Sequence, residues 1–249
     1  MTLWDAIKPA FATAPRPVEK PAEKPPAPPL TEDTDDDEED EETQAERDDR
    51  RFFLVGWFRR TRADVEHRVE QLTGMLAGGE IDSRGWADAF RKELTDAHSE
   101  AHSIGRRLAG FLGPFSPEDR AAGEAAWAEQ EEYFAGFLAD LERGRYTKPD
   151  GTLNERAFDA RAKQYAAATR GTAHEAFRVA LGKDLTDWNL SAAVHCKLSP
   201  DFPYNCPDLA AESPKPADEW QTAPGRGKCP CRGNCLCWLS TDKYSTEGL

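Results

Sequence analysis

Apolar residues recur at helical spacing through the middle of the chain. Within residues 64–76, the apolar positions Val65, Val69, Leu72 and Leu76 follow one another at intervals of four, three and four residues. Because an α-helix has about 3.6 residues per turn, this spacing places the four side chains on one face. The pattern predicts an amphipathic helix, which the following pair of glycines ends.

Three further apolar stripes follow, and each begins near a residue suited to cap a helix. The second stripe follows Asp82 or Ser83, and the fourth starts near Asn154. The third follows Ser116 and has Pro117 at its first helical position. The three stripes consist of Trp86, Phe90, Leu94, Ala97, Ala101, Ile104, Leu108 and Phe111; of Trp127, Gln130, Phe134, Phe137 or Leu138, and Leu141; and of Phe158, Ala162, Tyr165, Ala176, Phe177 and Ala180.

No alternating strand pattern competes with the helical period between residues 51 and 182. The sequence therefore predicts a mainly α protein whose body, residues 51–182, is a helical bundle or an elongated helical array. Residues 183–249 lose the helical period and hold all six cysteines. We expect them to form a small cysteine-rich module.

Residues 1–50 have the composition of a disordered arm. A proline-rich stretch is followed by the run TEDTDDDEEDEE, whose like charges repel and which holds nothing apolar to bury. Before both stands MTLWDAI, where Leu3, Trp4 and Ile7 fit one turn of an amphipathic helix. We interpret it either as an ordinary flexible terminus or as a docking peptide on a tether.

The charge of the chain is concentrated in this arm. Residues 1–50 hold 16 acidic and 6 basic residues, a net charge of −10, which leaves −4 of the total of −14 for residues 51–249. A weakly acidic body has no general attraction for nucleic acid. The longest strongly apolar run, Phe52 to Phe58, is far shorter than the roughly 20 residues of a membrane span, so we expect no membrane association.

The cysteines predict a structural metal site. We see no signal peptide and expect folding in a reducing cytoplasm, where clustered cysteines bind metal more often than they form disulfides. A structural Zn²⁺ takes four tetrahedral ligands, commonly from two close pairs. The preferred set is Cys196, Cys206, Cys231 and Cys235, with Cys229, Cys237 or His195 as alternates. Disulfides formed in an oxidising medium are the alternative.

Two other groups of residues invite a functional interpretation. His98 and His102 share a helix face, but Glu100 does not sit beside His98 as in an H-E-x-x-H motif, so we expect a surface or interface pair and no metal. The run RFFLVGWFRR at residues 51–60 either starts a buried helix or forms a contact surface in an assembly. Its candidate partner contacts are Phe52, Phe53, Trp57 and Phe58, together with Leu3, Trp4 and Ile7 of the arm.

The cysteine-rich end resembles a known family. The residues that carry the resemblance are, in order, Cys196; Cys206-Pro-Asp-Leu-Ala-Ala-Glu-Ser-Pro; Trp220; Thr222-Ala-Pro-Gly; and Cys231-Arg-Gly-Asn-Cys235-Leu-Cys237. They look like the end of the minor head proteins of tailed bacteriophages, the Mu F-like head morphogenesis group. Residues 129–138 and 161–165 also look like the helical body of that group. The chain departs from it at Gly233 and Asn234, where many members have a histidine.

The resemblance implies a structural virion protein and no enzyme. It implies a role in capsid assembly near the portal vertex, with the portal or the major capsid protein as partner, in a head assembled in the host cytoplasm. It allows a homo-oligomer and proximity to packaged DNA without sequence-specific binding. Two alternatives remain: a zinc-dependent hydrolase, and a zinc-ribbon protein that binds nucleic acid. Residues 183–249 hold 7 basic and 9 acidic residues, whereas a zinc-ribbon protein that binds nucleic acid would need an excess of basic residues.

Overall fold

The computed structural model describes residues 42–184, 189–193, 214–220, 223–226, 237–241 and 243–249. These residues form a mainly α fold, as the sequence predicts. Among them, no helix combines the length and the apolar character that crossing a membrane requires.

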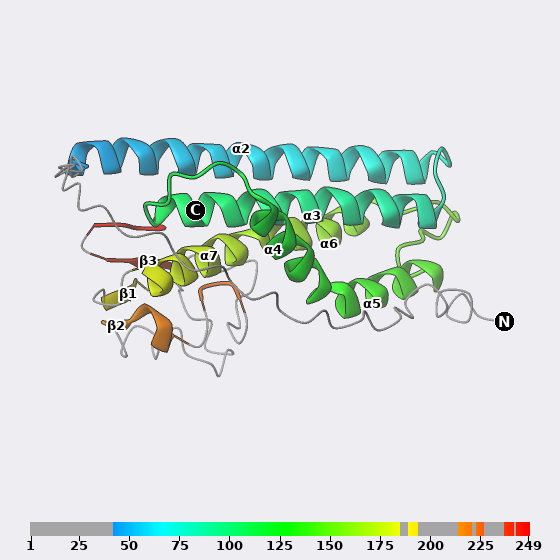
Figure 1. Cartoon of the computed structure of the whole chain (residues 1–249). Helices are drawn as coiled ribbons and strands as arrows, with labels where there is room; N and C mark the ends of the chain where they lie inside the picture. The colour runs from blue at the N-terminus through cyan, green and yellow to red at the C-terminus, as the bar shows by residue number, and fades with distance from the viewer. Residues whose placement is uncertain (1–41, 185–188, 194–213, 221–222, 227–236, 242) are drawn as a thin grey trace, which may run out of the picture. The chain divides into compact units, whose positions relative to one another are not determined.

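Helices α2 and α3 are the longest of the described helices. Helix α2 spans Gln44–Ala77 and begins at a capping box in which Thr43 and Glu46 exchange hydrogen bonds. Helix α3 spans Ser83–Leu108 and has the expected Asp82 as its N-cap. The two helices contact each other and run in opposite directions (Figure 1). Helix α2 starts before the boundary expected at residue 51, so the last residues assigned to the arm belong to the helical body.

The third predicted helix is two helices in the structure. Helix α4, Pro117–Ala128, has the expected cap at Ser116 and proline in its first turn. The chain then turns at Gln130, and α5 spans Glu131–Glu142. The apolar period continues across the break. Trp127 before it and Phe134 after it pack together, with ring centroids 5.0 Å apart. Periodicity therefore did not reveal the turn.

The fourth predicted helix is also divided, between α6, Glu155–Ala167, and α7, Thr169–Asp184. The expected cap, Asn154, accepts a hydrogen bond from the backbone of Ala157. A single turn residue, Ala168, separates the two helices. Phe111 was expected on the second stripe, but α3 ends at Leu108 and Gly110 has a positive φ of 94°, so Phe111 lies outside the helix and is half exposed.

The described C-terminal residues form a small antiparallel sheet with strand order β2–β1–β3. The strands are β1, Asn189–Ala193; β2, Lys215–Pro216; and β3, Trp238–Ser240. Leu190 lies opposite Lys215, and Ala192 lies opposite Leu239. The short 3-10 helix η2, Ala217–Glu219, follows β2 and contacts α7.

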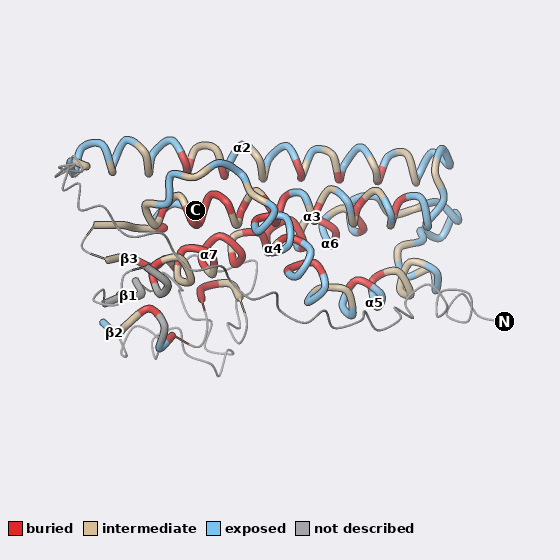
Figure 2. The backbone as a smooth tube through the Cα atoms, viewed as in Figure 1, coloured by how far each residue is buried: buried red, intermediate tan, exposed pale blue. Residues whose placement is uncertain are grey.

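Two clusters of buried side chains form the core, and Figure 2 shows buried positions on the facing sides of the helices. One cluster is helical and rich in aromatic rings, with Trp86, Phe90, Phe134, Phe137 and Phe158 at its centre. The other joins α2, α3 and α7 to the C-terminal residues. Its members include Leu54, Phe58, Ile104, Phe177, Leu181, Trp220, Leu239 and Leu249. The described C-terminal residues therefore share a core with the helical body.

Candidate interaction site

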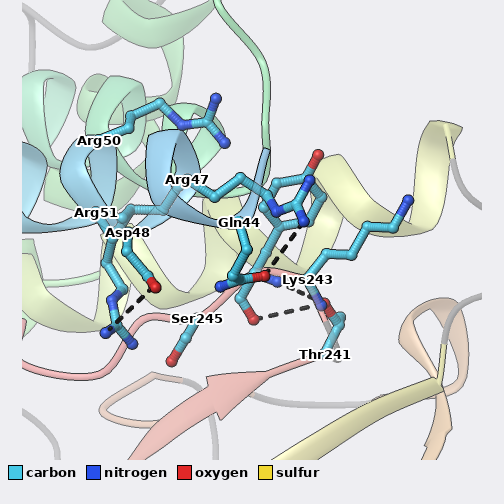
Figure 3. Close-up of a pocket in the computed structure, with 10 residues that line it drawn as sticks. Gln44, Arg47, Asp48, Arg50, Arg51, Thr241, Lys243 and Ser245 are labelled. Carbon is cyan, nitrogen blue, oxygen red and sulfur yellow. Dashed lines mark hydrogen bonds and ion pairs between the residues drawn. The ribbon is translucent and has the colours of Figure 1, made fainter. Parts of the chain in front are cut away.

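A pocket lies between the first turns of α2 and the C-terminal residues that follow β3. Its cavity has a volume of about 140 Å³ (Figure 3). Helix α2 supplies Gln44, Arg47, Asp48, Arg50 and Arg51, and α3 supplies Leu108; the C-terminal residues supply Thr241, Lys243, Tyr244 and Ser245. Four of these side chains are cationic and one is anionic, so the lining is predominantly basic.

The position of these arginines follows from the register of α2. Arg47 and Arg51 precede Leu54, Val55 and Phe58 at helical intervals, and these three apolar residues are buried in the core. The arginines therefore occupy the first turns of the same face that the helix buries further along. Thr241, Lys243, Tyr244 and Ser245 lie against this part of the face. The Thr241 hydroxyl accepts hydrogen bonds from the backbone N–H groups of Lys243 and Tyr244.

Neighbouring groups hold the arginines in place. Arg50 pairs with Glu42, and its guanidinium lies 5.7 Å from the centre of the Tyr244 ring. Arg51 approaches Glu247 at 3.4 Å, which ties α2 to the last residues of the described chain. Arg47 donates hydrogen bonds to the Glu42 carbonyl and to the Gln44 side chain.

An exposed aromatic pair lies on another face of the same helix. Phe52 is 83% exposed and Phe53 is 59% exposed. Phe53 approaches the half-buried Trp57, with ring centroids 6.3 Å apart, and Arg107 of α3 lies over the Trp57 ring. We call Phe52, Phe53 and Trp57 the aromatic face of α2.

Among the partner contacts expected within residues 51–60, the prediction for Phe58 is wrong. Its side chain is only 2% exposed and packs in the core shared by α2, α3 and α7. Helical periodicity explains the difference, because Phe58 lies one turn from Leu54 and Val55 on the buried face. Leu3, Trp4 and Ile7 lie outside the described residues.

The preferred metal ligands also lie outside the described residues. This holds for Cys196, Cys206, Cys231 and Cys235, and for the alternates Cys229 and His195. The alternate Cys237 is described; it is buried and immediately precedes β3. No group of three histidine, cysteine or acidic side chains suited to a metal ion occurs within the described parts of the chain.

The histidine pair was expected at the surface or at an interface, and the surface alternative is wrong. His98 is fully buried and bonds Thr172 at 2.7 Å through one ring nitrogen. The Gln130 side-chain amide nitrogen lies 2.7 Å from its other ring nitrogen. Burial, aided by the nearby Arg226, lowers the pKa of His98 to about 3. The ring joins α3 to α7 and to the turn between α4 and α5.

His102 joins α3 to α4 instead. Its Nδ1 lies 2.7 Å from one carboxylate oxygen of Asp119. Arg106 donates one hydrogen bond to each of the two carboxylate oxygens. Burial disfavours the charged carboxylate, but hydrogen bonds from Arg106, from the histidine ring and from the capping serine outweigh it and hold the pKa of Asp119 below its usual value. Both histidines of the pair therefore bond to neighbouring helices, and their rings do not converge on one ion.

Sequence reasoning did not find the basic pocket. Its arginines were visible in the run ERDDRR, at residues 46–51, where they continue the spacing of the buried face. Lys243 and Tyr244 had no signal in the sequence, because only folding brings them against α2. Comparison of the chain with family models, with curated proteins and with solved structures gave no match.

Proposed function

We propose that this protein is a minor head protein of a tailed bacteriophage, a structural component that acts in head assembly near the portal vertex. The observation that carries the proposal is the aromatic face of α2, with Phe52 and Phe53 exposed on a helix whose opposite face is buried in the core. Exposed aromatic side chains favour a protein contact. The cysteine pattern at the C-terminus supports the particular family.

The proposed partner is the portal or the major capsid protein, with a second copy of this chain as the alternative. Helix α2 is well suited to present a contact. The core holds it through Leu54, Val55 and Phe58, and Arg59 donates two hydrogen bonds to the Gly248 carbonyl. A rigid helix loses little conformational entropy when a partner binds. The part of the arm that precedes α2 serves in this proposal as the tether that recruits the protein to a forming head.

The bonding of the buried polar side chains also supports a structural role. His98, His102 and Asp119 each bond residues of neighbouring helices. A general base needs instead a ring nitrogen or carboxylate oxygen directed at a substrate. The competing hydrolase would use zinc with an open coordination position, whereas a ligand set rich in cysteine is typical of a closed structural site.

The first prediction concerns the aromatic face. The double variant Phe52→Ala/Phe53→Ala should lower the number of copies incorporated per head, because it removes apolar contact area from the partner interface. Its thermal midpoint should stay close to that of the unchanged chain, since both rings are exposed. Quantitative mass spectrometry of purified heads, from cells in which the variant replaces the protein, measures the copy number.

Tyr133→Ala is the matched control, because Tyr133 is an aromatic side chain that is 49% exposed on α5, away from the aromatic face. It should leave the copy number unchanged. Equal incorporation of the double variant and the control would exclude Phe52 and Phe53 as the contact. Absence of the unchanged chain from purified heads would refute the minor head protein itself.

The second prediction concerns the metal. We propose that Cys196, Cys206, Cys231 and Cys235 hold a structural Zn²⁺, so elemental analysis of the purified protein should find about one zinc ion per chain. The four ligand thiols should become titratable only after chelation, because zinc binds the thiolate form. A protein without metal whose cysteines titrate freely, or are paired as disulfides, would contradict this.

A further inference from the structure

We infer that the basic pocket between α2 and the C-terminal residues after β3 is a binding site for a phosphate-class oxyanion. Arg47 of α2 and Lys243 from the other end of the chain are its proposed ligands; Arg50 and Arg51 also line the pocket, but their guanidinium groups point away from that of Arg47 (Figure 3). The inference is independent of the proposed function, because it rests only on the geometry and charge of this pocket.

The pocket has the size and the donors for one tetrahedral anion. A cavity of about 140 Å³ has room for a single phosphate group. The charged ends of Arg47 and Lys243 carry only hydrogen-bond donors, and a guanidinium group matches the spacing of phosphate oxygens. Asp48 is the one carboxylate in the lining, and it lies 3.7 Å from Arg51.

The register of α2 makes these arginines unusual. Arg47 and Arg51 lie at the start of the face that buries Leu54, Val55 and Phe58. A helix normally continues its apolar stripe on such a face, since placing guanidinium groups there costs free energy unless an anion compensates them. Arg51 is 36% exposed and pairs with Glu247, whereas the two acceptors of Arg47 are neutral oxygens, so Arg47 is the better candidate to bind an anion.

Arg47 has a donor that a bound anion could use. Its two terminal nitrogens donate to the Glu42 carbonyl and to Gln44, but its Nε is buried and has no hydrogen-bond acceptor among the described residues. A buried donor left without an acceptor is destabilising. An oxyanion bound beside Arg47 would offer the missing acceptor.

Carboxylates of the chain itself compete for the same arginines. Glu42 pairs with Arg50, and Glu247 pairs with Arg51. The Arg51 and Glu247 side chains are 36% and 55% exposed, so this pair is weak and a doubly charged phosphate can displace it. Arg50 and Glu42 are only 15% and 30% exposed, so Glu42 is the stronger competitor. This makes a specific prediction: removal of the Glu42 charge should strengthen anion binding, whereas removal of either proposed ligand should weaken it.

The test is isothermal titration calorimetry of the full chain with inorganic phosphate at low ionic strength. We expect saturable binding with a dissociation constant of about 1 mM or tighter. Arg47→Gln and Lys243→Gln should each weaken binding about tenfold or more, because each removes a charge-assisted hydrogen bond. Glu42→Gln should tighten it, which a variant that merely disturbs folding would not do.

Arg60→Gln is the matched control. Arg60 is exposed on the same helix and does not line the pocket, so its replacement makes the same change of charge without touching the site. It should leave the dissociation constant within about twofold, because an exposed charge more than two helical turns from the pocket acts on the bound anion mainly through water. Equal losses in Arg60→Gln and Arg47→Gln, or no saturable binding of phosphate by the unchanged chain, would overturn the inference.

The bound phosphate could be a free ion or a phosphodiester group of a nucleic acid, and a second titration distinguishes the two. If the site takes a phosphodiester of nucleic acid, a short DNA duplex should bind the full chain, lose affinity in Arg47→Gln and be displaced by inorganic phosphate. If the site takes a free oxyanion, phosphate alone should bind and the duplex should not. Both results support the oxyanion site and identify its source.

Discussion

At the scale of single residues, the buried carboxylate of Asp119 shows how charge is used inside this protein. Its side chain is fully buried, and it accepts hydrogen bonds from Arg106 at 2.8 Å and 3.0 Å and contacts His102. It also closes the capping box with Ser116 at the start of α4. One carboxylate therefore fixes both the start of α4 and its contact with α3.

Asp119→Ala should lower the free energy of unfolding by about 3–5 kcal/mol, because it leaves the buried Arg106 without its carboxylate. Asp140→Ala is the control, since Asp140 also pairs with two arginines, Arg143 and Arg145, but these are about 70% exposed. The control should cost much less, because ion pairs with exposed arginines contribute little to stability. Urea denaturation measures both, and similar losses would show that Arg106 does not depend on its carboxylate.

At the scale of helices, glycines set how closely α3 approaches its neighbours. A Cβ at Gly105 would lie 2.1 Å from the carbonyl oxygen of Ala173 and 2.8 Å from the Ala176 side chain. A Cβ at Gly123 would lie 2.0 Å from the Ser99 hydroxyl. Both values are far shorter than any van der Waals contact. Helices α7 and α4 therefore pack against α3 at distances that only glycine allows.

Gly105→Ala should destabilise the protein by about 1–3 kcal/mol, the usual cost of overpacking, although alanine favours the helical backbone. Gly74→Ala is the matched control in α2, because nothing lies within 4 Å of a Cβ at that position. It should stabilise the protein by about 1 kcal/mol. Thermal denaturation of the two variants should therefore move the midpoint in opposite directions; equal shifts would contradict the close packing of α3 on α7.

At the scale of the whole described structure, two buried histidines join distant parts of the chain. His98 of α3 bonds Thr172 of α7, and His174 of α7 bonds Thr246 near the C-terminus at 2.8 Å. Thr246 also bonds both backbone groups of Leu239 in β3. Burial lowers the pKa of His174 to about 3, with a smaller contribution from Arg170. Both rings are therefore neutral in the folded protein.

The stability of the fold should depend on pH through these rings. An unfolded histidine takes up a proton below about pH 6.5, whereas the folded rings take one up only near pH 3. The unfolded state then binds more protons, so stability falls as the pH decreases from about 6.5, by about 1 kcal/mol per pH unit for each ring. Above about pH 6.5 these rings contribute no slope.

Urea denaturation between about pH 7 and pH 5 measures this slope, in a range where few carboxylates titrate. His98→Gln should reduce the slope, since glutamine keeps hydrogen-bonding capacity without titrating. His67→Gln is the control, because His67 is exposed on α2, with 67% of its side chain accessible. An unchanged slope in His98→Gln would show that its protonation is not linked to folding.

The sequence by itself determined the helices and most of their buried faces. Asp82, Ser116 and Asn154 cap helices as expected, since a cap needs only its neighbours in the chain. Trp86, Phe90 and Leu94 are buried as their spacing predicts. Apolar periodicity is a local property, so it can be read without knowledge of the packing.

Only the tertiary structure decided where helices turn and which polar groups meet. The apolar period continues through Gln130 and Ala168, so the breaks there were not visible in the sequence. The bonds of His98 and the pocket formed by Arg47 and Lys243 join residues far apart in the chain. Such contacts depend on how α2, α3, α7 and the C-terminal residues pack together, which the local sequence pattern does not specify.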